Sequence, residues 1–158
     1  MLMDILTPGA GAMIAQTIQL ALAPVFVLVA IGSIIATLTQ RLGRVVDRSR
    51  ELQKLYVETS DVEHDMVVRE IRISDQRIAL LGHALLLLVL ASLSIGVTVV
   101  LLFMEEFAHV GLNPIAAGTF ILAIALFMWA LVVFLQETRK GTEALRIPVS
   151  FLECEREL

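Results

Sequence analysis

The chain has 158 residues, of which 58% are hydrophobic and 18% charged, and its formal net charge is −4 at pH 7. A mean hydropathy of +0.85 excludes an ordinary soluble domain of this length and predicts an all-α protein that lies in a lipid bilayer. Nucleic acid is not an expected partner, because no basic run is free of acidic residues.

Three apolar stretches are long enough to cross about 30 Å of hydrocarbon as helices. They cover residues 14–39, 78–104 and 114–135. The first is expected to stay attached, because no lysine or arginine precedes it as one would in a signal peptide. The other segments are an external N-terminus (1–13), a polar segment (40–77), an external loop (105–113) and a tail (136–158). Asn113 and Pro114 have the cap-then-proline order that predicts the start of the third helix.

The basic residues predict the orientation of the chain. All 12 lysines and arginines lie either in the polar segment or after the third apolar stretch, which places them on one side of the membrane. By the positive-inside rule this side is the cytoplasm. We therefore expect a multi-pass membrane protein with the N-terminus outside and the C-terminus in the cytoplasm.

The polar segment carries apolar residues at alternating three- and four-residue steps, which is the spacing of a coiled-coil seam. The outgoing set is Leu42, Val45, Ser49, Leu52 and Tyr56, and the returning set is Val67, Ile71, Ser74, Ile78 and Leu81. Between them, "ETSDVEHD" is typical of a turn. The segment therefore predicts a cytoplasmic, antiparallel, coiled-coil-like helical hairpin, and its seam continues into both apolar stretches. In the first stretch the seam runs back through Leu38, Ile35, Ile31 and Leu28. The first helix should leave the membrane without a break.

A polar stripe follows the opposite face of the first helix. Its candidate pore-lining or helix-packing residues are Gln16, Gln19, Phe26, Ser33, Thr37, Gln40 and Arg44. Amides and hydroxyls without partners are costly in hydrocarbon, so this face should avoid lipid. Two arrangements achieve this: the stripe packs against another helix, with Gly32 and Ala36 allowing close approach, or several copies turn it toward a water-filled path.

The stripe favours a homo-oligomeric small channel as the function. The alternative is a membrane scaffold or sensor whose hairpin binds a cytoplasmic protein partner. We expect no enzyme, no cofactor and no metal site, because the known catalytic motifs are missing and no acidic residue lies within the three apolar stretches. Glu105 and His109 could share a helix face, but two ligands do not make a metal site.

The chain also resembles a known family. The stretch "IQLALAPVFVLVAIGSIIATLTQRLGRVVDRSREL", followed by "EIRISDQRIALLGHALLLLVLASLSIG", is similar to a bacterial family of small membrane proteins known as domain of unknown function 2721. The resemblance covers roughly residues 14–136, and residues 39–48 are its most specific part. It implies an integral protein of a bacterial inner membrane with this layout, and it brings no activity, cofactor or functional residue.

Overall fold

The computed structural model consists of three long helices and describes residues 8–60, 62–108 and 111–144. The helices are α1 (Pro8–Glu58), α2 (Val62–Ala108) and α3 (Asn113–Ala144). Each contains a stretch that is long and apolar enough to cross a membrane. The protein is therefore an all-helical, multi-pass membrane protein by the length and composition of its helices. The cytoplasmic orientation of any part remains a prediction.

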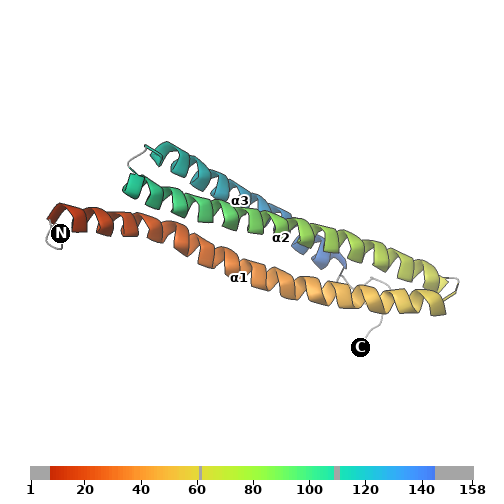
Figure 1. Cartoon of the computed structure of the whole chain (residues 1–158). Coiled ribbons are helices and arrows are strands. Elements are labelled where there is room, and N and C mark those ends of the chain that lie inside the picture. The colour runs from red at the N-terminus through yellow and green to blue at the C-terminus, as the bar shows by residue number, and fades with distance from the viewer. Residues whose placement is uncertain (1–7, 61, 109–110, 145–158) are drawn as a thin grey trace, which may run out of the picture.

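Helix α1 has 51 residues and does not end at Arg41. At 1.5 Å per residue it is about 76 Å long, more than twice the thickness of the hydrocarbon core. Pro24 lies inside it and removes one backbone hydrogen bond, but the helix continues on both sides. The chain then turns at Thr59 and returns as α2 alongside α1 (Figure 1). We call residues 40–77, the two arms beyond the apolar stretches and their turn, the polar arm.

Helix α2 lies between α1 and α3, and its contact with α1 follows the predicted seam (Figure 1). The α1 residues at seven-residue steps are at most 8% exposed: Ile31, Leu38, Val45 and Leu52. The seam loosens at both ends, since Leu28 is 40% and Tyr56 46% exposed. Between Ile18 and Val29, most large apolar side chains of α1 are exposed, and Figure 1 shows the N-terminal part of this helix diverging from α2.

The contact between α2 and α3 is built from small side chains. The buried apolar residues of α3 are alanines at seven-residue steps, Ala116, Ala123 and Ala130. Small residues let two helix backbones approach closely, which is how helices associate where lipid removes the hydrophobic driving force. A hydrogen bond of 2.9 Å between the hydroxyls of Thr98 and Thr119 joins the same two helices.

The turn from α2 to α3 has two local determinants. Gly111 has a φ of 70°, a left-handed conformation that costs other residues about 1–2 kcal/mol. Glu105 accepts hydrogen bonds from the backbone N–H of Leu112 and from Nδ2 of Asn113. The carboxylate thereby caps α3, which begins at Asn113 as the Asn-Pro pair predicts.

Candidate functional site

Three charged side chains, one from each helix, meet where the apolar stretches end. Arg41 of α1 follows the first apolar stretch, Arg77 of α2 directly precedes the second, and Glu137 of α3 follows the third by two residues. The three contact one another through Glu137. We call this group the charged junction.

The geometry of the charged junction is centred on a buried carboxylate. The Glu137 side chain is 1% exposed, whereas the side chains of Arg77 and Arg41 are 27% and 37% exposed. Arg77 donates from Nε and Nη2 to Oε1 of Glu137, at 3.0 and 2.9 Å. Arg41 donates from Nη1 to Oε2 at 3.5 Å, and its guanidinium lies 5.2 Å from the centre of the Phe134 ring.

The two arginines supply the hydrogen bonds and the positive charge that allow the Glu137 carboxylate to be buried. An ionised carboxylate without partners is costly in an apolar interior, and here both of its oxygens accept hydrogen bonds from guanidinium groups. The arginines remain partly exposed, so they keep contact with water or lipid headgroups. The charged junction therefore fixes the relative positions of three helices at one level.

Gly141 makes room for this contact. It lies one helical turn after Glu137, and a Cβ at this position would be 3.1 Å from Nη2 of Arg77. The Arg77 guanidinium thus passes over α3 where the helix has no side chain.

The sequence analysis missed Glu137, although a signal was present. The buried alanines of α3 recur every seven residues, and Glu137 occupies the next position of the same series, seven residues after Ala130. The analysis assigned Glu137 to the tail and used Arg41 and Arg77 only to predict orientation. Helix α3 in fact continues to Ala144, beyond the end of the apolar stretch.

A pocket lies next to the charged junction, between α1 and α2. Its cavity volume is about 270 Å³. The lining residues are Arg41, Arg44, Val45, Arg48, Glu70, Ile73, Ser74 and Arg77. We call it the arginine pocket, because four of these residues are arginines and one is acidic.

The arginines of the pocket differ in how they are paired. Arg48 contacts Glu70 through Nε and Nη2 at 3.0 and 2.9 Å, and Glu51 at 3.4 Å. The hydrogen bond and the negative charge of Glu70 raise the pKa of Arg48. Arg44 is exposed and has no ion pair in the part of the chain that the structure describes.

The predicted polar stripe lies on a surface that no part of the described chain covers. Five stripe residues at or before Gln40 are exposed, Phe26 by 67%; the five are Gln19, Phe26, Ser33, Thr37 and Gln40. The side chain of Gln16 lies outside the described residues, and Arg44 is shared with the arginine pocket. Thr37 donates from its hydroxyl to the backbone oxygen of Ser33, at 3.1 Å.

Two other polar residues, His83 and Glu105, have local partners. Nδ1 of His83 lies 2.7 Å from the backbone oxygen of Ala79 and so acts as the donor in a bond one turn long. Glu105 caps α3, and His109 lies outside the described residues. Among the residues that the structure describes, no group of three or more His, Cys, Asp or Glu side chains could hold a metal ion.

The comparison with family models gives one match. The model described as "Protein of unknown function (DUF2721)" matches residues 21–147. The chain belongs to this family. No curated protein and no solved structure matches. The matched range includes the charged junction and the arginine pocket, so the three-helix arrangement described above lies within the family's domain.

Proposed function

We propose that this protein is a non-enzymatic, homo-oligomeric membrane channel in which the polar stripe of α1 lines the path. The supporting observation is that the stripe is exposed on α1 while the opposite face of the same helix packs on α2. Helix α3 contacts the far side of α2 and leaves the stripe uncovered. A second copy of the chain is the partner that shields the membrane-spanning part of the stripe, from Gln19 to Gln40, from lipid.

The surface beside the stripe is open enough for such an assembly. A Cβ at Gly32 would meet nothing within 4 Å, and Ala36 is also exposed. Within the described chain, the amides of Gln19 and Gln40 have no hydrogen-bond partner. Several copies around an axis would place Gln19 toward one mouth of a path, Phe26 at an apolar constriction, and Ser33 and Thr37 in the half nearer the polar arm.

The test is ion flux in liposomes with two matched threonine variants. Thr37 lies on the stripe and Thr39 does not, yet both are exposed and both donate to the backbone oxygen four residues earlier. We expect Thr37→Leu to abolish flux and Thr39→Leu to retain it. Absence of flux through the unmodified protein, or equal flux through both variants, would refute the channel. An assembly without flux that Thr37→Leu disrupts would identify the stripe as a dry packing surface.

A second candidate function, a scaffold or sensor that binds a cytoplasmic protein, is favoured by the tip of the polar arm. Exposed apolar side chains gather there: Leu55, Tyr56, Val57 and Met66, exposed by 39%, 46%, 82% and 65%. Val57 lies 16 residues beyond Arg41, about 24 Å along the helix, so the bilayer does not cover it. Exposed apolar patches on polar surfaces are typical of protein contacts.

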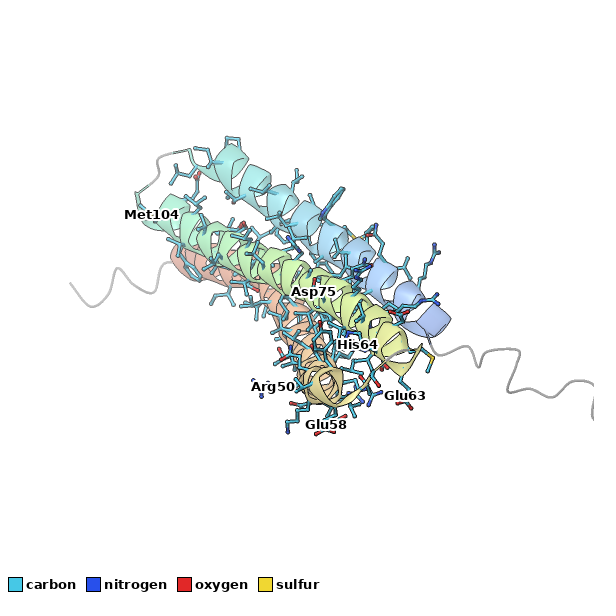
Figure 2. The ribbon with its side chains drawn as sticks, turned by 90° about the vertical axis from the view of Figure 1, so that its right-hand side faces the viewer. Arg50, Glu58, Glu63, His64, Asp75 and Met104 are labelled. Atoms are coloured by element: carbon cyan, nitrogen blue, oxygen red, sulfur yellow. The ribbon has the colours of Figure 1, made fainter. Side chains whose placement is uncertain are left out.

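Site-specific photo-crosslinking tests this second function. A crosslinker at Val57 should give a discrete adduct with another protein in cells, and Met66→Glu should remove that adduct. A crosslinker at Arg50, which points away from α2 on the same helix, is the control (Figure 2). An adduct only with a second copy of the chain, or none, would refute partner binding at the tip.

A further inference from the structure

We propose that the arginine pocket binds the phosphate of an anionic phospholipid headgroup at the membrane surface. This inference does not depend on whether the protein conducts ions. It is based on the residues that line the pocket, the position of the pocket along the helices, and the lack of an ion pair at Arg44 among the described residues.

The first observation is an excess of positive charge. Four arginines line the pocket. Three carboxylates contact them: Glu137 binds Arg41 and Arg77, and Glu70 and Glu51 bind Arg48. Four cations against three anions leaves one positive charge, and Arg44 is the cation without an ion pair among the described residues. A phosphate oxygen is the partner that a guanidinium binds most effectively besides a carboxylate.

The second observation is that the pocket has room and a neutral donor. Its volume of about 270 Å³ is far more than the share of about 30 Å³ that one water molecule occupies. The Ser74 side chain is 7% exposed and lines the same cavity. Its hydroxyl makes no hydrogen bond within the described part of the chain, so it can donate to a ligand.

The third observation is the level of the pocket on the helices. The edge of the pocket nearest the membrane is formed by Arg41 and Arg77, which adjoin the apolar stretches of α1 and α2. Its far edge, at Arg48 and Glu70, is seven residues away, or about 10 Å along each helix. Lipid phosphates occupy this layer just beyond the hydrocarbon. Basic pockets between transmembrane helices at this depth are typical binding sites for anionic headgroups.

The level of the pocket also distinguishes a lipid from a soluble phosphate. A headgroup is held at this height by its own acyl chains, which lie in the hydrocarbon beside the apolar stretches of α1 and α2. A lipid therefore gains affinity from its headgroup, which contacts the arginines, and from its acyl chains, which remain in the hydrocarbon. Free phosphate gains affinity from the arginines alone.

Native mass spectrometry of the purified full chain tests the proposal. The protein in detergent is titrated with phosphatidylglycerol, with phosphatidylcholine, and with phosphatidylglycerol in the presence of inorganic phosphate. We expect phosphatidylglycerol to be retained over phosphatidylcholine, and excess phosphate to leave this retention largely intact. Equal retention of the two lipids would overturn an anionic site, and displacement by phosphate at matched concentration would overturn the lipid as the source.

Three single-residue variants test whether the lipid binds in the arginine pocket. Arg44→Gln should lower phosphatidylglycerol retention roughly fivefold, which corresponds to about 1 kcal/mol per basic residue near a membrane surface. Arg50→Gln removes the same charge from the same helix outside the pocket and should have little effect. Ser74→Leu fills the cavity without changing charge and should also lower retention. Unchanged retention in both pocket variants, or an equal loss in Arg50→Gln, would overturn the assignment to this pocket.

Discussion

Arg77 and Glu137 are 60 residues apart in the sequence, and Arg77 donates two hydrogen bonds to one oxygen of the Glu137 carboxylate. The pair joins α2 to α3 at the level where both helices leave their apolar stretches. Because Arg41 reaches the other oxygen, the same carboxylate also connects α1, which has little other contact with α3.

Loss of the charge on Glu137 should destabilise the three-helix arrangement. Glu137→Gln keeps the shape of the side chain but leaves two arginines without a carboxylate. Hydrogen bonds to charged groups contribute about 1.5–3 kcal/mol, and the partial exposure of both arginines places the expected loss toward the lower end. Reversible unfolding by a denaturing detergent in mixed micelles measures it. Glu51→Gln, at a 66% exposed position, should change stability by less than about 0.5 kcal/mol.

The elements of the fold were predictable because their signals are local. The apolar stretches gave the three helices, the Asn-Pro pair gave the start of α3 at Asn113, and the seam gave the buried Leu38 and Val45. The absence of a helix-breaking signal near Arg41 correctly indicated that α1 continues. Each of these inferences needs only the spacing of residues within one helix.

Which faces of the three helices contact one another was not predictable in the same way. In lipid an apolar face is equally stable against acyl chains or against another helix, so hydropathy does not say which faces meet. Leu28 lies on the predicted seam yet is 40% exposed, whereas Ile31 on the same seam is fully buried. The burial of Glu137 was not predicted, because its place beyond the third apolar stretch suggested a solvated tail. Its position seven residues after Ala130, in the alanine series of α3, was the informative signal.

The two arginines of the charged junction should contribute unequally. Arg77 makes two bonds of 2.9 and 3.0 Å to Glu137, whereas Arg41 makes one of 3.5 Å. Double-mutant cycles that combine Arg77→Gln or Arg41→Gln with Glu137→Gln measure each coupling. We expect about 1–3 kcal/mol for Arg77 and less than about 1 kcal/mol for Arg41. Equal couplings would mean that total charge, not the geometry of the Arg77 contact, determines stability.

A methyl group at Gly141 should weaken the charged junction. Its Cβ would approach Nη2 of Arg77 to 3.1 Å, so the guanidinium must shift away from Glu137. Replacing glycine by alanine inside a helix otherwise stabilises by about 0.5–1 kcal/mol. Gly118 provides the control, since a Cβ there meets nothing within 4 Å. We expect Gly118→Ala to be neutral or stabilising and Gly141→Ala to be less stable than Gly118→Ala in the same unfolding assay.

Enlarging one alanine of the α3 series should separate α2 from α3. Ala123 is fully buried, at 0% exposure, so a larger side chain there must displace its neighbours. Overpacking of this kind typically costs about 1–3 kcal/mol. Ala125→Leu adds the same volume on an exposed position of the same helix, where lipid can accommodate it. We therefore expect Ala123→Leu to lower the detergent-unfolding midpoint and to weaken a disulfide engineered between Thr98→Cys and Thr119→Cys, whose parent hydroxyls lie 2.9 Å apart. If both leucine variants formed this disulfide equally well, the alanine series would not determine the spacing of the two helices.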